Sequence, residues 1–341
     1  MATVDTTPWP AGDWRQLLAD AVSDLDELLA LLDLDESCFG KRADALRSVR
    51  SFALRVPRGF IGRMRRGDPD DPLLRQILPI DREMISVGGF TADPVGELSS
   101  PPVDSVLHKY RGRALVIVTG ACAIHCRYCF RRHFPYVDHG AAVGNPEAAI
   151  ARITVDPGIN EVVLSGGDPL TMADLRLERL ARSLAAAPHV RRLRIHTRLP
   201  IVLPQRVDAT LASWIGDLGL PVVVVVHANH ANEIDGNVRR ALAALDAAGA
   251  TLLNQAVLLA GVNDSAAALA NLSETLFDAG ALPYYLHMLD PVEGAAHFEV
   301  PEDRARRLQT ELTNRLPGYL VPRLVREVEG APAKVGVDLW R

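Results

Sequence analysis

The chain has 341 residues, of which 48% are hydrophobic and 23% are charged, and its formal net charge is −5. A chain of this size can bury a large core, so it permits one α/β barrel or two smaller domains. The mild charge gives no reason to expect binding to nucleic acid or to an anionic membrane surface. The sequence shows no apolar run that could span a bilayer, and the first residues lack the basic and apolar regions of a secretory signal.

The first third of the chain predicts an N-terminal helical extension. Apolar residues recur at helical spacing from about residue 13 to 65, and a turn-rich stretch follows at 67–72. Residues 73–110 have little periodicity. We therefore expect residues 1–105 to form the extension and residues 106–341 to form the main domain.

After residue 105 the sequence alternates between β-rich runs and amphipathic helices. The β-rich runs begin near Ala114, Glu161, Arg192, Val222, Leu252 and Pro283. From the second run onward their spacing is roughly 30 residues, the length of one βα unit. Apolar strands alternating with helices indicate a parallel sheet covered by helices, and six units predict a partial (β/α)6 barrel in the α/β class. In such a barrel the chemistry lies at the C-terminal ends of the strands.

Three of the four cysteines follow the first of these runs directly, as Cys122, Cys126 and Cys129. Three thiolates on one loop can ligate three irons of a [4Fe–4S] cluster and leave the fourth iron free to bind a small molecule. A disulfide framework would spread the cysteines along the chain. Their grouping therefore predicts a protein of a reducing compartment, the cytoplasm, with one metal site.

Other interpretations of these cysteines stay open from the residues alone. A structural zinc ion would need a fourth ligand, which His125 or His133 could supply. A ferredoxin-type electron carrier would need a fourth cysteine, and only Cys38 remains. Three buried cysteines without any metal are the last alternative.

The CxxxCxxC spacing after a first barrel strand resembles the radical S-adenosylmethionine (SAM) superfamily. This resemblance implies that the open iron binds SAM and that an electron from the cluster cleaves it to a 5′-deoxyadenosyl radical. Tyr128 matches the aromatic position beside the adenine. Ser165-Gly166-Gly167-Asp168 matches the glycine-rich SAM motif, where bare glycine backbone permits close approach. Without the cysteines, this motif would be interpreted as an ordinary βα turn.

Several motifs in order narrow the resemblance to the lysine 2,3-aminomutase family. They are RVPRGFIGRM (55–64), CRYCFRR (126–132), LSGGDPL (164–170), LPQR (203–206), HANHANE (227–233), VLLAGVND (257–264) and APAK (331–334). The resemblance implies a radical isomerase that converts (S)-α-lysine to (R)-β-lysine with pyridoxal 5′-phosphate (PLP) as a further cofactor. The length and the helical N-terminal stretch resemble the short branch of the family, which supplies β-lysine for the modification of elongation factor P.

The resemblance also implies which residues bind PLP. Lys334 matches the lysine that holds PLP covalently, whereas the sequence alone would make it a solvated tail lysine. Tyr110 and Arg113 match positions that approach PLP, and a guanidinium suits its phosphate.

For the substrate, Arg131 matches the arginine that binds the carboxylate, and Asp264 and Glu327 match two carboxylates that bind the ε-ammonium. Glu327 is a departure, because the family has aspartate seven residues before its PLP lysine. The alternative for Arg131 and Asp264 is an ordinary surface or capping residue. Two carboxylates would repel glutamate as a substrate but do not exclude arginine.

The expected partners are free lysine and a reductant protein such as flavodoxin or ferredoxin, with elongation factor P or its lysyl ligase as a further candidate. A catalytically weak scaffold that delivers lysine to a ligase is an alternative to the enzyme. His196, His227 and His230 fall at strand ends. They could line the pocket or be structural.

Overall fold

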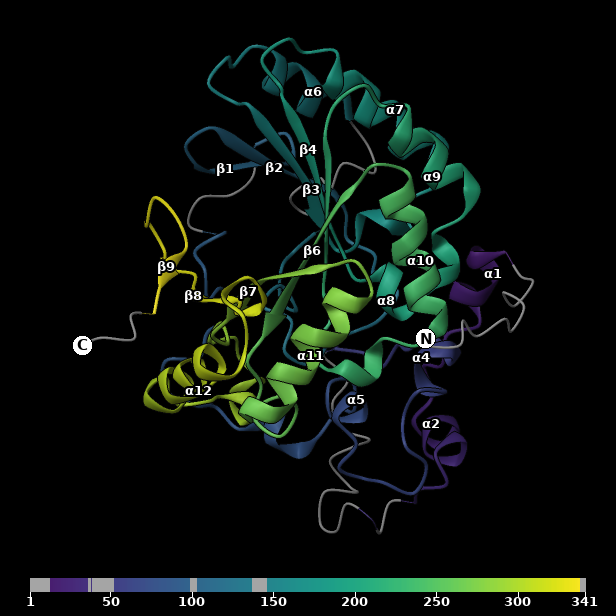
Figure 1. The fold of residues 1–341 in the computed structure, drawn as a ribbon, viewed down its shortest axis with the longest axis vertical. Coiled ribbons are helices and arrows are strands. Elements are labelled where there is room, and N and C mark those ends of the chain that lie inside the picture. Colours follow the sequence, from purple (N-terminus) through teal and green to yellow (C-terminus); the bar gives the residue numbers. More distant parts are fainter. Residues whose placement is uncertain (1–12, 36–37, 39–51, 99–102, 137–145, 338–341) are drawn as a thin grey trace.

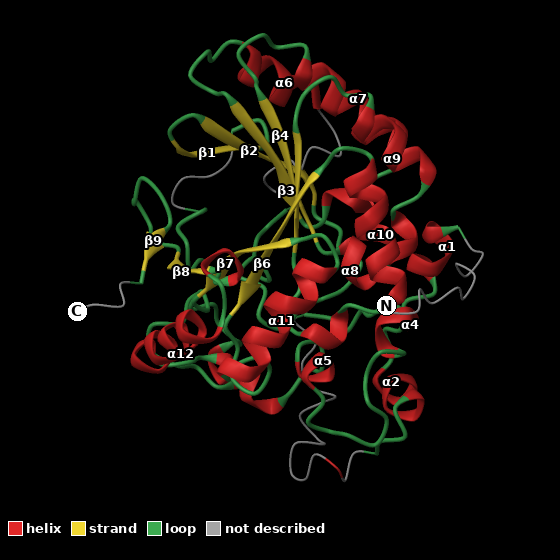
Figure 2. Ribbon diagram, in the orientation of Figure 1, coloured by secondary structure: helices red, strands yellow, loops and turns green. Residues whose placement is uncertain are grey.

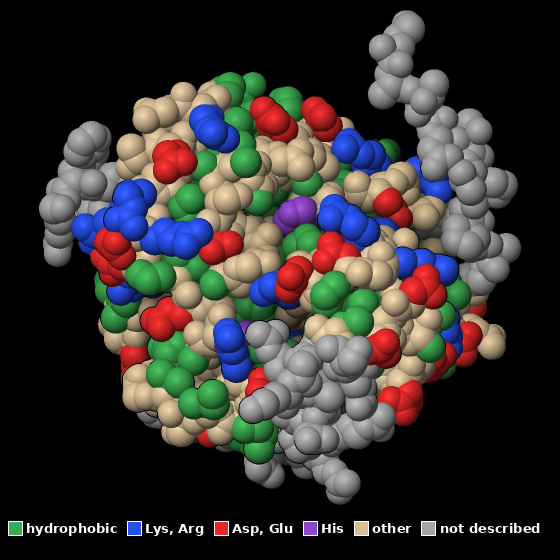
Figure 3. Space-filling view, turned by 90° about the horizontal axis from the view of Figure 1, so that it is seen from below, with side chains coloured by type: hydrophobic (Ala, Val, Ile, Leu, Met, Phe, Trp, Pro, Cys, Tyr) green, Lys and Arg blue, Asp and Glu red, His purple; other side chains and the backbone are tan. Residues whose placement is uncertain are grey.

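The computed structural model describes residues 13–35, 38, 52–98, 103–136 and 146–337. Within these ranges, no helix has the length and apolar character needed to traverse a membrane. Basic and acidic side chains are interspersed on the face of the molecule shown in Figure 3, in keeping with the small net charge.

One sheet forms the centre of the molecule, and its strand order follows the chain. The strands are β1 (Val106–Tyr110), β2 (Arg113–Thr119), β3 (Glu161–Gly166), β4 (Arg192–Thr197), β5 (Val222–Val226), β6 (Thr251–Val257), β7 (Leu282–His287), β8 (Arg323–Arg326) and β9 (Val335–Gly336). Strands β2 to β8 run parallel, while β1 and β9 pair antiparallel at the two edges. The predicted parallel barrel strands are therefore confirmed as β2 to β7, and β8 adds a seventh that the sequence did not predict.

Helices cover the outer side of the curved sheet (Figures 1 and 2). They are α6 (Pro146–Thr154), α7 (Asp174–Ala185), the short α8 (Leu199–Val202), α9 (Ala209–Gly216), α10 (Gly236–Ala247), α11 (Ala266–Asp278) and α12 (Glu302–Arg315). Asp235 and Ser265 cap α10 and α11, because each side chain accepts a hydrogen bond from the backbone three residues on. Gly249 and Gly280 follow these helices with φ of 84° and 85°, so both predicted glycine stops are confirmed.

The N-terminal extension contains the short helices α1 (Trp14–Ala19), α2 (Leu25–Leu31), α4 (Arg58–Ile61) and α5 (Pro72–Arg75). The prediction of helix throughout 13–65 was therefore only partly right. Between α1 and α2, Val22 pairs with Val56 in an antiparallel bridge, and residues 36–37 and 39–51 lie outside the described part.

The extension packs on the barrel rather than standing apart from it. Its buried side chains belong to the same hydrophobic core as those of the sheet and outer helices. Arg63 donates to the carbonyl oxygens of Ile201, at 2.8 Å, and Glu233, which lie after β4 and β5. The boundary at 105/106 remains a prediction.

Candidate active site

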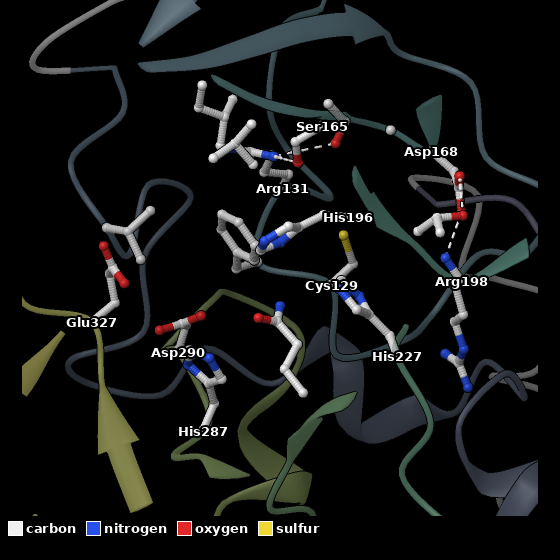
Figure 4. Close-up of a pocket in the computed structure, with 18 of the residues that line it drawn as sticks. Cys129, Arg131, Ser165, Asp168, His196, Arg198, His227, His287, Asp290 and Glu327 are labelled. Atoms are coloured by element: carbon white, nitrogen blue, oxygen red, sulfur yellow. Dashed lines mark hydrogen bonds between the residues drawn. The ribbon is translucent and has the colours of Figure 1, made fainter. Parts of the chain in front are cut away.

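A pocket of about 290 Å³ opens inside the curved sheet, toward the C-terminal ends of the parallel strands (Figure 4). Every residue that the sequence assigned to a site lines it, except Asp264. These lining residues are Tyr110, Arg113, Cys122, Cys126, Tyr128, Cys129, Arg131, Ser165, Gly166, Gly167, Asp168, Glu327 and Lys334. The barrel thus gathers side chains that are far apart in the sequence.

The three cysteines of the loop after β2 are free thiols on one wall of this pocket. Burial raises the pKa of Cys122, and burial together with Cys126 raises that of Cys129 to about 11, so these two thiols keep their protons without a metal. A cationic iron cluster would replace those protons, so the donor set fits the expected cluster.

The alternative ligands lie elsewhere. The Nδ1 atom of His125 is 2.7 Å from the carbonyl oxygen of Ala53, and Nε2 of His133 is 3.2 Å from that of Glu293. Cys38 is exposed and does not line the pocket. Among the described residues, no three His, Cys, Asp or Glu side chains converge as a single-ion site would require. These contacts argue against zinc and against a four-cysteine cluster.

Gly166 and Gly167 bring the end of β3 against the cysteine loop. The backbone N–H of Gly167 donates to the carbonyl oxygen of Thr119 at 2.7 Å, and that of Asp168 donates to Ala121 at 2.7 Å. A Cβ at Gly167 would lie 2.3 Å from the carbonyl oxygen of Ala121, and Gly166 has φ of 121°. Both positions therefore need glycine so that the two backbones can touch.

Asp168 ties the ends of β3 and β4 together. Its buried carboxylate accepts hydrogen bonds from the Thr197 hydroxyl and the Arg198 backbone N–H, both at 2.7 Å. Burial raises its pKa to about 6 despite these hydrogen bonds.

Arg198 was missed by the sequence analysis and lies beside the cysteine loop. Its guanidinium is 2.7 Å from the Cys126 sulfur and 2.5 Å from the Tyr128 hydroxyl. It also pairs with buried Glu233 at 3.0 Å. Its position directly after β4 is the only sequence signal that could have found it.

Arg131 is held by Glu97, a residue of the extension that sequence reasoning also missed. Arg131 donates from Nε and Nη2 to the two carboxylate oxygens at 2.7 and 2.8 Å, and from Nη1 to the Ser165 hydroxyl at 3.3 Å. Burial alone would raise the pKa of Glu97, but Arg131 and Lys109 together hold it below its usual range. This pairing fixes the guanidinium plane at one end of the pocket.

Lys334 and Glu327 lie at the other end. The Lys334 ammonium is 2.8 Å from one Glu327 oxygen, and the Tyr110 hydroxyl donates to the other. Burial opposes ionisation of Glu327, yet Lys334 and Tyr110 hold its pKa below its usual range. Arg113 stacks on Tyr110 at 4.9 Å. The amine of Lys334 and these partners on the same wall fit a covalently held pyridoxal group.

The assignment of Asp264 to the pocket was wrong. Its Oδ1 accepts a hydrogen bond from the backbone of Gly261 at 3.0 Å, and its Oδ2 pairs with Arg304 at 3.0 Å. Asp264 therefore stabilises the turn after β6 and the packing of α12. Asp290 lines the pocket instead, near Glu327 and Lys334 (Figure 4). Its place three residues after β7 was the signal that could have found it.

His196 and His227 line the pocket, as does His287, which was not predicted. Burial lowers the pKa of all three, and that of His227 to about 3, so their rings are neutral. Their Nε2 atoms are buried without a hydrogen-bond partner among the described residues. They are therefore available to a bound ligand. His230 lies outside the pocket lining, and its Nδ1 caps the turn at Asn232.

Comparison with known proteins gives matches along most of the chain. Residues 116–269 match the family model described as the radical SAM superfamily. The chain is 50% identical to the L-lysine 2,3-aminomutase of Escherichia coli (strain K12) over 341 residues, covering 99% of this chain and 98% of that protein. It is 44% identical to the L-lysine 2,3-aminomutase of Haemophilus influenzae, with 94% of each covered. It is 32% identical to the L-lysine 2,3-aminomutase of Clostridium subterminale, covering 95% of this chain and 77% of that protein.

Proposed function

This chain belongs to the lysine 2,3-aminomutase family of the radical SAM superfamily, and from that premise we propose that it converts (S)-α-lysine to (R)-β-lysine. One observation carries the proposal. A single pocket contains three free thiols and a lysine that is paired with a carboxylate, and it has an arginine at one end and carboxylates at the other. This is the set of groups that radical chemistry on a dipolar, cationic amino acid requires.

The cofactors follow from the same residues. Cys122, Cys126 and Cys129 would hold the [4Fe–4S] cluster, with SAM between Tyr128 and the 165–168 turn, and Lys334 would hold PLP. When bound, the cluster and SAM supply a radical that removes a hydrogen atom from the substrate, while PLP carries the amino group between two carbons. The chain itself supplies the walls that keep water from the radical.

The charged ends of the pocket would orient the substrate. Arg131 would bind the carboxylate, because Glu97 and Ser165 hold its guanidinium in one plane. Asp290 and Glu327 would bind the ε-ammonium. An anionic side chain such as that of glutamate would meet these two carboxylates and be repelled.

The short-branch features of the sequence support a place for the product in β-lysylation of elongation factor P. In that setting, a flavodoxin or ferredoxin would donate the electron, elongation factor P or its lysyl ligase would receive the β-lysine, and the protein would lie in the cytoplasm.

An anaerobic assay tests the activity. The chain, reconstituted with iron, sulfide and PLP, is incubated with SAM, dithionite and lysine, and chiral chromatography identifies the product. We expect (R)-β-lysine from lysine and no rearranged product from glutamate, and a parallel reaction with arginine tests the remaining cationic alternative. Rearrangement of arginine but not lysine would overturn the substrate, and a reducible cluster that never cleaves SAM would overturn the enzyme class.

A further inference from the structure

The cysteine loop has a rear side that faces the N-terminal extension. His125 and Arg127 lie between cysteines in sequence, but neither lines the pocket. The backbone N–H of His125 donates to the carbonyl oxygen of Arg55 at 3.0 Å, and that of Arg127 donates to Gln76 at 2.9 Å. Residues far upstream in the sequence therefore hold the loop from behind.

A buried ion triad completes this rear contact. Arg127 donates to both carboxylate oxygens of Glu83, at 2.8 and 2.5 Å. Arg132 donates to the same carboxylate at 2.7 Å, and to the carbonyl oxygen of Arg127 at 3.0 Å. The three side chains are between 0 and 2% exposed, and both guanidinium groups lie 5.0 Å from the Phe52 ring. Water screens these buried charges much less than it screens charges at the surface, so they act more strongly on neighbouring groups.

The triad is electrostatically coupled to the cysteines. Arg127 directly follows Cys126 in the loop. The backbone N–H of Arg132 donates to the carbonyl oxygen of Cys129 at 3.1 Å. A change of charge in the triad therefore changes the electrostatic potential at the sulfur atoms and at any cluster that they hold.

We propose that Glu83 is a positioning residue for the cluster. It holds Arg127 and Arg132 behind the cysteine loop and offsets one of their two buried positive charges. The first effect keeps the thiols in place for iron, and the second keeps the reduction potential low, because excess positive charge stabilises the reduced cluster. A low potential is what the reductive cleavage of SAM demands. The inference rests on the assignment of Cys122, Cys126 and Cys129 as cluster ligands.

The first test measures the reduction potential. The full chain is reconstituted without SAM, and electron paramagnetic resonance follows the one-electron reduction of the [4Fe–4S] cluster during a redox titration. Glu83→Gln removes a negative charge and should shift the potential upward. Arg132→Gln removes a positive charge and should shift it downward. Simple loosening of the loop gives no reason for opposite signs, so equal potentials or shifts in the same direction would overturn the proposal.

The second test measures how firmly the loop is held. Glu83→Gln should lose iron to a chelator at least about tenfold faster than wild type, because removing one partner of a buried ion pair strongly destabilises its surroundings. Glu27→Gln is the matched control. It makes the same change in the same extension, at an exposed pair with Arg58, and should leave both the potential and iron loss unchanged. An unchanged rate in Glu83→Gln would overturn the positioning role.

The outcomes separate this inference from the proposed function. If wild type itself holds no [4Fe–4S] cluster, the proposed function fails. If Glu83→Gln holds no cluster but still shows the visible absorbance of PLP on Lys334, the loss is confined to the cysteine loop and supports the inference.

The double variant Glu83→Gln with Arg132→Gln restores the net charge of the triad and should return the reduction potential to that of wild type. A potential as high as that of Glu83→Gln would contradict the charge argument.

Discussion

Asp290 and Asp264 show how two similar residues acquire different roles. Each follows a parallel strand, but only Asp290 reaches the pocket, whereas Asp264 pairs with Arg304 outside it. Asp290→Asn should lower kcat/KM for lysine by on the order of a hundredfold, because it removes the carboxylate that would pair with the substrate ε-ammonium in the buried pocket. Asp264→Asn should lower it far less. Product formation by both variants, with cluster content measured in parallel, checks this prediction, and the reverse ranking would contradict it.

The ionisation of Asp290 predicts a dependence of stability on pH. Burial raises its pKa to about 7 in the folded chain. Since the folded-state pKa is above the unfolded one, ionised Asp290 destabilises the fold, and this destabilisation grows as pH rises from about 4 to about 7. Fully developed, it is on the order of 4 kcal/mol. In the ligand-free chain, Asp290→Asn should therefore be more stable than wild type at pH 8. At pH 5, this difference in the free energy of unfolding should be clearly smaller.

Urea unfolding at the two pH values measures this difference. The same difference between wild type and Asp290→Asn at pH 5 and pH 8 would show that the carboxyl does not titrate in this range.

Single residues differ in how far the sequence could predict them. The spacing of the cysteines alone indicates that they share one loop, whereas the roles of the 165–168 turn and Lys334 were assigned through the family resemblance. All of them line the pocket. Glu83 and Glu97 lie in the extension, where no periodicity marks them, and their partners Arg127 and Arg131 are 44 and 34 residues away. Asp264 was assigned through the family resemblance of residues 257–264, and sequence spacing does not show that its loop turns away from the pocket whereas the loop that carries Asp290 turns into it.

At the scale of elements, the close contact between the end of β3 and the cysteine loop limits the size of the side chains at these positions. Gly167→Ala would place its Cβ 2.3 Å from the carbonyl oxygen of Ala121. Because that neighbour is backbone, the loop must move, and we expect a loss of about 1–3 kcal/mol in stability together with poor iron retention. Gly318→Ala, with open space around its Cβ, is the control. Thermal unfolding and iron content of both variants test this, and equal behaviour would contradict it.

Strands β2 to β7 were predictable because each is a β-rich run, and amphipathic helices lie between them. Strand β8 has only four residues, with arginine at both ends, and β9 has two. Segments that short carry no periodic signal, and pairing with an existing sheet edge decides their structure. The break at Val22 arises in the same way, from its tertiary partner Val56.

At the scale of the whole molecule, the shared core predicts that the extension and the barrel unfold together. Trp14 of α1 is buried and lies 4.6 Å from Arg206, which is itself fully buried beside the outer helices. In a chain whose other tryptophans are replaced by phenylalanine, urea transitions followed by Trp14 fluorescence and by far-ultraviolet circular dichroism should coincide. An earlier fluorescence transition would show that the extension is an independent unit.

The sequential order of the strands has a consequence for biosynthesis. Each strand can pair with its predecessor as soon as both have left the ribosome. The extension cannot dock so early, because Arg63 and Gln76 find their partners Ile201 and Glu233 only 138 to 170 residues later. Contacts across such separations form late in folding. The extension thus docks only after chain segments that lie far downstream of it, and its apolar side chains stay exposed to chaperones until the loop after β5 has emerged.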